Sequence, residues 1–585
     1  MMHTTRIQQP RLLKLMLILC VCTCSELTAA AERPDAGESV EAWYTVRDWI
    51  NTLAVPPHGA PTADVQISGA SCYCLLLRFQ GRTVGIGTAT SEDEAMLRTA
   101  AERAIQSAMN NRTIAALPED IKKEAGRQLT LELEVGGTME PLVGESFSAF
   151  ENDIHPIHDG IALRWDDEWA YRFPSKLRLS NNHAHAALFD GMTLAMDRSL
   201  LNARSALLRG DVTAYRFPVL DIGQASPTSA PMELIGGMLG GAPVPTEHNL
   251  RLAQAALTDH ITQSIWPGED LLGLMGTYKP AADRFDPLIA SPADQALLAF
   301  SLARVANAGT LDPARADAAA ETAAMILSVL ASREETTSIG TSASIVLAMN
   351  ALPDMLPTDA ISDMHDAALE QLMTLAESST EDDEATSAHA AALAAYALAR
   401  HGAHEHARDL ADHAWEALPV ERHSTLFPWI VWCELELAEA GTLSRREHLL
   451  DVRNQLHQRQ VPPMDTRFGM ELAGGYVLGR NPDDVTAQSL RPGSALPAML
   501  QSRDLTPPEQ ARDEWNRVRA CAGFLLSLQV TPAGATLYSN AKRSSGGVRR
   551  AAWDARMQPA AQAMALLTLQ ELLALDSRYL NPTDK

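Results

Sequence analysis

Three aspartates in predicted loops are candidates for catalysis. Asp283 and Asp286 lie in a turn-rich stretch ahead of a predicted helix, and Asp554 lies in a second such stretch near the C-terminus. Two carboxylates facing each other across a cavity are the groups with which many enzymes cleave glycosidic bonds. Glu269 and Asp270 are close to the first pair in sequence and extend the set. The chemistry that these acids suggest is hydrolysis or elimination at a saccharide.

Aromatic, basic and glycine residues accompany the acids. Aromatic rings provide a wall on which a sugar or another apolar ring can stack. The candidates for this wall are Trp266, Tyr278, Phe285, Tyr476 and Trp553. Arg549 and Arg550, which follow the glycines Gly546-Gly547, could hold a carboxylate of a ligand. The alternative is structural, with Asp554 and Arg556 pairing to brace their own loop and the other acids capping helices.

Two groups of histidines are candidate metal ligands. His155 and His158 precede Asp159, and His183 and His185 follow farther along the chain. Imidazole and carboxylate are ligands of zinc, so a site would form if the two loops converged. The alternative is that the second group marks a solvated helix start. Because no spacing here requires a metal, we expect no metal and no other cofactor.

Composition and missing motifs exclude several classes of function. The chain lacks Gly-x-Ser-x-Gly, a phosphate-binding loop, a dinucleotide fingerprint and His-Glu-x-x-His. These absences remove α/β-hydrolases, nucleotide hydrolases, dehydrogenases and thermolysin-like proteases. A formal net charge of −25 repels phosphate backbones, so we expect no nucleic-acid partner. The expected partner is a small molecule or a protein.

Residues 1–31 have the features of a secretory signal peptide. Basic residues precede an apolar run at 15–22, and Ala29-Ala30-Ala31 supplies a small-residue cleavage site. The apolar run is shorter than the roughly 20 residues that cross a bilayer, and no later segment has the character of a span. We therefore expect export to a periplasm or the outside of the cell. Lipoprotein anchoring at Cys24 is the less favoured alternative.

Residues 40–222 predict a domain of helices and strands. Residues 129–135 alternate leucine or valine with threonine or glutamate, the pattern of a strand with one buried and one solvated face. Ser91 with Glu94 predicts the start of a helix. Cys72 and Cys74 fall on one face of another predicted strand, a poor geometry for a disulfide, so we expect two buried thiols.

The order of these elements resembles the AMMECR-type domain, the family of the AMME-syndrome candidate protein. The matching segments are Ile86-Gly87-Thr88, the helix 91–110, the strand 129–135, Asp159-Gly160-Ile161 running to Phe173-Pro174, and Tyr215-Arg216-Phe217. Val84-Gly85 stands where the family has Gly-Cys. The resemblance therefore implies an α+β fold and carries over no active-site residue.

The rest of the chain predicts a connection followed by helices. Residues 223–247 are rich in glycine, proline and serine, which is typical of a flexible linker. Residues 248–578 predict successive helices and no strand. Ser291-Pro292 and Asp312-Pro313 mark helix starts, and Thr506-Pro507 predicts another.

Glycine-bearing loops between the helices predict a ring of helical pairs. Gly474-Gly475-Tyr476 and Gly546-Gly547-Val548 are interpreted as two copies of one loop. With Leu528-Gln529 ahead of the second copy, the pattern is similar to the α/α toroids of the squalene-cyclase and prenyltransferase superfamily, where Gln and Gly-Gly motifs recur. The acidic Asp-x-Asp-Asp motif of the cyclases is absent, because the acids at 381–384 occupy a predicted helix start.

The fold expected is therefore an AMMECR-like α+β domain followed by an all-α toroid. Two functions remain open. The first is binding of a ligand or partner in the concave face of the toroid, without catalysis. The second is a carbohydrate-active or terpenoid-cyclase-like enzyme, which requires at least two of the loop acids to share one cavity with aromatic walls.

Overall fold

The structure is a computed structural model that describes residues 32–575 and residue 579, with gaps. The gaps are residues 61–64, 143–153, 156, 166–167, 181–204, 207–208, 271, 334–337, 354–355, 379–386, 440–442, 464–469, 480–484 and 576–578. The expected signal peptide at 1–31, His183, His185 and the acids at 381–384 lie outside the described residues.

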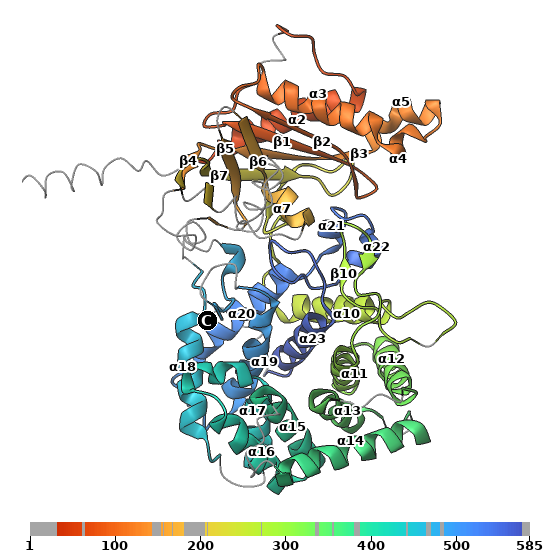
Figure 1. Cartoon of the computed structure of the whole chain (residues 1–585), viewed down its shortest axis with the longest axis vertical. Helices are drawn as coiled ribbons and strands as arrows, with labels where there is room; N and C mark the ends of the chain where they lie inside the picture. Colours follow the sequence, from red (N-terminus) through yellow and green to blue (C-terminus); the bar gives the residue numbers. More distant parts are fainter. Residues whose placement is uncertain are drawn as a thin grey trace, which may run out of the picture.

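The N-terminal region is organised around an antiparallel sheet (Figure 1). Its main path runs β2-β1-β3-β7-β5-β6, and every neighbouring pair on this path is antiparallel. The strands are β1 Cys72–Phe79, β2 Arg82–Thr90, β3 Leu129–Gly136, β4 Glu140–Pro141, β5 Asp159–Trp165, β6 Glu168–Arg172 and β7 Thr213–Gly223. The prediction of mixed helices and strands in this region is confirmed.

Helices cover one face of this sheet (Figure 1). They are α2 Ala36–Thr52 and α3 Met96–Asn110, and the helices α4 Arg112–Ala115 and α5 Glu119–Gln128 pack against these two. Leu131 and Leu133 of β3 are buried in one apolar cluster with Trp43 of α2. Helix α3 begins later than Ser91, because the Asp93 carboxylate accepts a hydrogen bond from the Thr90 amide at 3.0 Å and closes a turn there.

The opposite face of the sheet is also buried. Cys72 and Cys74 are buried free thiols on this face, as predicted. Glu132 and Glu134 are 0% exposed, so the prediction of a solvated face for β3 is wrong. The short helix α7 (Pro174–Ser180) and the helical region lie on this side of the sheet (Figure 1).

The segment whose composition predicts a flexible linker contains a hairpin. Strand β8 (Met232–Ile235) pairs with β9 (Met238–Leu239) and with the end of β7. Its turn is Gly236-Gly237, where φ is +58° and +72°, values that favour glycine. The sheet therefore continues into the connection between the two regions.

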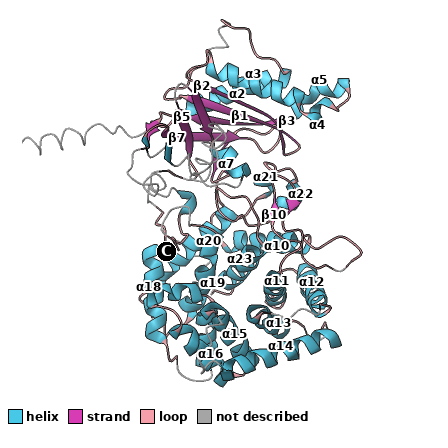
Figure 2. Ribbon diagram, in the orientation of Figure 1, coloured by secondary structure: helices cyan, strands magenta, loops and turns pink. Residues whose placement is uncertain are grey.

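The C-terminal region is mostly helical, as predicted (Figure 2). Its long helices are α10 Glu247–Thr262, α11 Pro292–Ala306, α12 Pro313–Ala331, α13 Ile339–Ala351, α14 Asp359–Ser378, α15 Ala388–His401, α16 His404–Glu416, α17 Trp429–Glu439, α18 Arg446–Arg459, α19 Leu490–Gln501, α20 Ala511–Leu528 and α23 Pro559–Leu573. The short elements are β10 Tyr278–Lys279, β11 Arg284–Phe285, η1 Val420–Leu426, η2 Met470–Leu472, η4 Ala487–Ser489, α21 Pro532–Ala535 and α22 Ala541–Ser544. The two-residue strands β10 and β11 correct the expectation of no strand.

Two of the three predicted helix starts are confirmed. Ser291 caps α11 by accepting from the Asp294 amide, and Asp312 caps α12 by accepting from the Arg315 amide. Thr506 does not cap a helix, because its hydroxyl donates to the Met499 carbonyl at 2.8 Å and α20 begins later.

Six helices contact one another in a closed order. Helix α11 contacts α13, and the contacts continue through α15, α17 and α19 to α23, which returns to α11. The remaining long helices pack outside this ring. Among them, α12 contacts α10 and α14, and α14 contacts α16. Among the described helices, none combines the length and apolar character that crossing a membrane requires.

Candidate functional site

Asp283 and Asp286 lie on the short hairpin formed by β10 and β11. The Asp283 carboxylate accepts from the Tyr278 hydroxyl and from Arg543 Nη1, each at 2.9 Å. Asp286 is exposed and pairs with Lys279, which lowers the pKa of its carboxyl. Neither acid lines any of the cavities described below. Both therefore brace the hairpin.

Asp554 braces its own loop. Its carboxylate is 0% exposed and accepts from Arg550 Nη1 at 3.0 Å and from Arg556 Nη2 at 2.6 Å. The Arg556 amide donates to it as well, at 3.0 Å. The structural alternative for this residue is thus confirmed. Glu269 and Asp270 are exposed on another loop.

The predicted aromatic wall is dispersed. Tyr278 packs against Phe285 with ring centroids 5.0 Å apart. Tyr476 is buried in the helical core, where Gln460 Nε2 donates to its hydroxyl at 3.3 Å. Trp266 is half-buried beside its own loop, and Trp553 is buried next to Arg550. None of these five rings lines any of the cavities described below.

Gly546 belongs to a loop that is closed by glutamine side chains. Gln529 Nε2 donates to the Gly546 carbonyl at 2.9 Å and to the Ala253 carbonyl at 2.8 Å. Gly546 has φ +82°, and a Cβ there would lie 2.2 Å from the Ala256 carbonyl oxygen. The space at Gly547 is likewise filled, so the pair packs against α10 and binds no ligand in this arrangement.

Gly474 occupies the same place in a second copy of this loop. Gln460 Nε2 donates to the Gly474 carbonyl at 3.2 Å, as Gln529 does to Gly546. The backbone of Gln460 forms an antiparallel β-bridge with Tyr476, and the backbone of Gln529 forms the same bridge with Val548. The prediction that the two stretches are copies of one loop is confirmed by these matching contacts.

Arg549 and Arg550 have different surroundings. Arg549 is buried, and its Nη1 donates to the Gly236 carbonyl at 2.6 Å and to the Ala552 carbonyl at 3.0 Å. It therefore ties the hairpin turn of the N-terminal region to the helical region. Arg550 lines a small cavity of about 160 Å³ at one end of the ring, together with His389.

A polar cavity of about 220 Å³, here called the ring cavity, lies near the C-terminal ends of the ring helices. It is lined by Phe300, Arg304, Leu347, Asn350, Ala351, Tyr396, Arg400, Trp432, Leu435, Glu436, Glu439, Ala498 and Glu571. Arg304 of α11 pairs with Glu571 of α23, and its guanidinium lies 4.7 Å from the centre of the Trp432 ring. Arg400 pairs with Glu436 at 3.0 Å.

Two residues that line the ring cavity, Arg304 and Trp432, each carry a buried donor without a partner in the described part of the chain. Arg304 Nη1 and Trp432 Nε1 are buried and have no hydrogen-bond acceptor among the described residues. Burial raises the pKa of the Glu571 carboxyl, against the opposing effect of Arg304. Sequence reasoning missed these residues. The signal was present in Glu571, the one charged residue of helix α23.

A cluster of charges is buried between the sheet and α7. Glu132 pairs with Arg78 and, at 2.7 Å, with Arg178. Burial opposes ionisation of Glu132, but the two guanidinium groups lower its pKa overall. Burial, and then the charge of Glu132, raises the pKa of Glu134 to about 7, and burial raises that of Asp221 well above its usual range. Arg178 of α7 pairs with both Glu132 and Asp221, and the Ser175 amide of α7 donates to Glu134, so the cluster joins α7 to the sheet.

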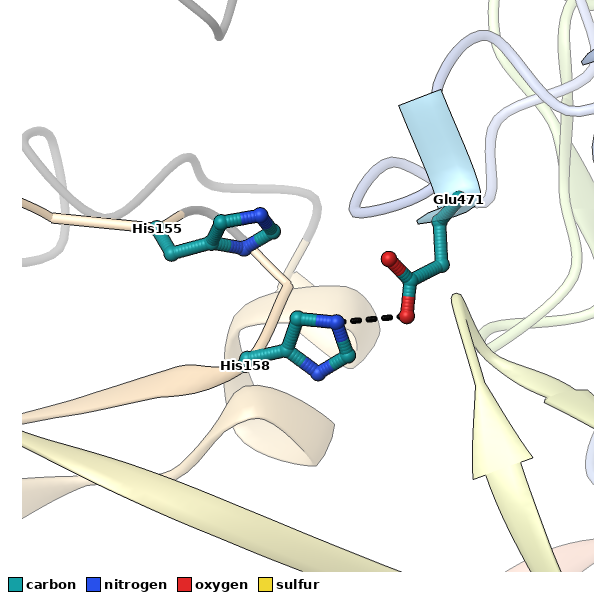
Figure 3. A group of neighbouring side chains, drawn as sticks. All are labelled: His155, His158 and Glu471. Carbon is teal, nitrogen blue, oxygen red and sulfur yellow. Dashed lines mark ion pairs between the residues drawn. The ribbon is translucent and has the colours of Figure 1, made fainter. Parts of the chain in front are cut away.

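A cavity of about 590 Å³ lies where the hairpin turn meets α20, and we call it the junction cavity. Glu471 lines it, as do Gly236, Arg519 and Ser527. Glu471 Oε1 lies 2.5 Å from Nε2 of His158, across the boundary between the two regions. Figure 3 shows His155 beside this pair, with its ring 4.7 Å from that of His158 between centroids.

Comparisons with known proteins do not assign a function to these residues. The sequence matches no described protein family and no curated protein. Its structure is similar to the crystal structure of the uncharacterized protein PH0010 from Pyrococcus horikoshii, with a TM-score of 0.25 and 15% sequence identity. The match covers 33% of this chain and 93% of that one. A likeness of this size carries no inference about fold or function.

Proposed function

We propose that this chain is an exported two-domain protein that binds a small polyhydroxylated ligand in the ring cavity. The observation that carries the proposal is the pair of buried donors, Arg304 Nη1 and Trp432 Nε1, that have no acceptor in the described part of the chain. The residues that carry these donors line the ring cavity together with Glu436 and Glu571, so a small rotation of either side chain would present its donor to a ligand. A hydroxyl group both donates and accepts hydrogen bonds, so a polyol or monosaccharide complements this lining.

The proposed domain identities are an AMMECR-like α+β domain and an α/α toroid of the squalene-cyclase and prenyltransferase type. The closed order of helix contacts from α11 to α23 supports the toroid. The two matching loops, in which Gln460 and Gln529 bond to glycine carbonyls, support it as well. Export rests on the sequence of residues 1–31 alone.

Calorimetric titration of the chain beginning at Glu32 tests the ligand. The panel would contain monosaccharides, sugar alcohols, uronic acids and an isoprenoid diphosphate. A ligand present at 100 times its Kd stabilises the folded protein by about 2.7 kcal/mol, so thermal shift serves as a first screen. Saturable binding of a polyhydroxylated compound is expected, and binding of the isoprenoid alone would contradict the proposed ligand class.

Matched tryptophan variants locate the site. Trp432→Phe removes the indole donor and keeps a ring, so we expect weaker binding by about 0.5–1.5 kcal/mol, the value of one hydrogen bond. Trp415→Phe makes the same change in a buried indole on α16 that does not line the cavity. Equal affinities of the two variants would place the ligand elsewhere.

A carbohydrate-active enzyme is the second candidate. Glu436 and Glu571 share the ring cavity with the aromatic rings of Tyr396 and Trp432. Each carboxylate pairs with an arginine, but the Glu571 side chain is 8% exposed and that of Glu436 is 24% exposed. Burial raises the pKa of Glu571, and such unequal surroundings suit one carboxyl as acid and the other as base. Release of product from oligosaccharides would favour the enzyme, provided that Glu436→Gln and Glu571→Gln each abolish it. Binding without turnover would favour the first proposal.

A further inference from the structure

We propose that His155, His158 and Glu471 bind a divalent transition-metal ion of the zinc class at the boundary between the two regions. One ligand atom from each residue lies within 4.8 Å of the others. In Figure 3 the two imidazole rings and the carboxylate converge on one space. This inference is independent of the ring cavity, which shares none of these residues.

The backbone of each ligand is held in place. His158 immediately precedes β5, and its carbonyl accepts from the Val219 amide of β7 at 2.7 Å. The Asp159 carboxylate accepts from the His155 amide at 2.7 Å, which fixes the turn that carries both imidazoles. On the other side, the Glu471 carbonyl accepts from Ser527 Oγ at 3.4 Å.

The distances between the three ligand atoms would fit a tetrahedral ion after movement of the side chains alone. Ligand atoms of a tetrahedral zinc lie about 3.3 Å apart, because each is about 2.0–2.1 Å from the metal. His158 Nε2 and Glu471 Oε1 are 2.5 Å apart and would separate slightly, whereas the widest pair would close from at most 4.8 Å. Changes of this size fall within rotation of the side chains about their χ angles.

Glu471 supplies a second, independent observation. Its side chain is 4% exposed, and Oε2 is buried without a hydrogen-bond donor among the described residues. A buried carboxylate oxygen that lacks a partner has lost its hydration without compensation. A metal ion that binds this carboxylate would supply that compensation.

The donor set selects the class of metal. Imidazole nitrogen suits zinc, copper, nickel and iron, whereas magnesium and calcium prefer oxygen ligands alone. Three protein ligands leave a fourth position of a tetrahedral ion open. Glu471 also lines the junction cavity, so a water or a ligand in that cavity is the group to fill it.

Cobalt titration tests the site. The untagged chain beginning at Glu32 is stripped with a chelator and titrated with Co²⁺, whose visible absorption reports four-coordinate binding, and Zn²⁺ is then used as competitor. We expect one equivalent to bind and Zn²⁺ to displace it. His155→Ala, His158→Ala and Glu471→Gln should each weaken binding by at least the 10–100-fold that loss of a mere supporting group causes.

Control variants separate metal binding from an ion pair. His58→Ala removes an exposed histidine of the same region and should leave the titration unchanged. Thermal unfolding of each variant with and without Zn²⁺ shows whether it is folded, and only the wild type and His58→Ala should gain stability from the metal. Absence of the cobalt spectrum from folded wild type would overturn the proposal. Binding that persists in all three site variants would overturn it too, and would point to histidines such as those of α16.

Discussion

The charged cluster beneath the sheet and the two glycine loops of the helical region bury their polar groups in different ways. Beneath the sheet the buried groups are charged, with Glu132 held between Arg78 and Arg178. In the helical region the loops are closed by neutral amides, as when Gln529 donates to the Gly546 carbonyl. A buried charge that loses its partner is far more costly than a neutral group that loses one hydrogen bond. We therefore expect the charged cluster to be more sensitive to substitution and to pH than the two glycine loops.

Loss of Arg178 is expected to have the largest effect. Arg178→Met removes a guanidinium 2.7 Å from Glu132 and 3.7 Å from Asp221, and leaves uncompensated charge in the interior. We expect the free energy of unfolding to fall by about 3–5 kcal/mol, measured by urea denaturation. Arg209→Met removes one partner of an exposed ion pair and should cost at most about 1 kcal/mol. A similar fall in the free energy of unfolding of both variants would show that the charged cluster is no more sensitive than an exposed ion pair.

Gly546→Ala tests the neutral loop at its tightest point. The positive φ costs an L-residue roughly 1–2 kcal/mol, and overlap with the Ala256 carbonyl adds about 1–3 kcal/mol. Gly402→Ala is the control, because Gly402 has φ +90° but nothing within 4 Å of an added Cβ. The difference between their unfolding free energies measures the overlap alone. No difference would mean that α10 gives way to the added methyl.

The pH dependence of stability should distinguish the charged cluster from the neutral loops. Glu134 has a folded-state pKa raised to about 7 from 4.5. A folded state that binds the proton more tightly is favoured below the unfolded pKa and loses that advantage as pH rises to about 7. Since one pKa unit corresponds to about 1.4 kcal/mol, the loss is up to about 3 kcal/mol.

Glu134→Gln isolates this contribution. The variant cannot titrate at this position, so the difference in Tm between it and the wild type should change between pH 4.5 and pH 7. The wild type should lose stability relative to the variant as pH rises through this window. Parallel curves would show that Glu134 keeps an ordinary pKa when buried.

Loss of one loop glutamine is expected to have the smallest effect. Gln529→Ala removes the donor to the carbonyls of Ala253 and Gly546, at a cost of about 1–2 kcal/mol. Gln460→Ala is the matched change in the other copy and should cost about the same in urea denaturation. A cost equal to that of Arg178→Met would show that the loops are as critical as the charged cluster.

Sequence predicted the features that depend on neighbours along the chain. Ser291 and Asp312 cap helices by bonding to amides three residues ahead. The copies of the glycine loop were recognisable because Gly474 and Gly546 stand in the same short pattern, with positive φ in both. These signals are local, so no tertiary contact was needed to interpret them.

Features that depend on distant partners were not predictable. Glu132 alternates with leucines like a solvated residue, but Arg178, 46 positions away, makes its burial possible. Asp283 resembled a catalytic acid until Arg543, 260 positions away, was found bonded to it. The ring cavity is not predictable from the sequence for the same reason, since Arg304 and Glu571 come from opposite ends of the helical region.

The Gly236-Gly237 turn limits how this chain can be dissected. A Cβ at Gly236 would lie 2.9 Å from Glu471 Cγ, and one at Gly237 would lie 2.7 Å from Arg549 Nη1. The stretch that joins the regions is therefore also a packed part of each. A fragment that begins at residue 248 would leave Arg549 without the Gly236 carbonyl, and one that ends at residue 222 would lose the pairing of β7 with β8. Truncation on either side of the connection would therefore remove contacts of the half that is kept.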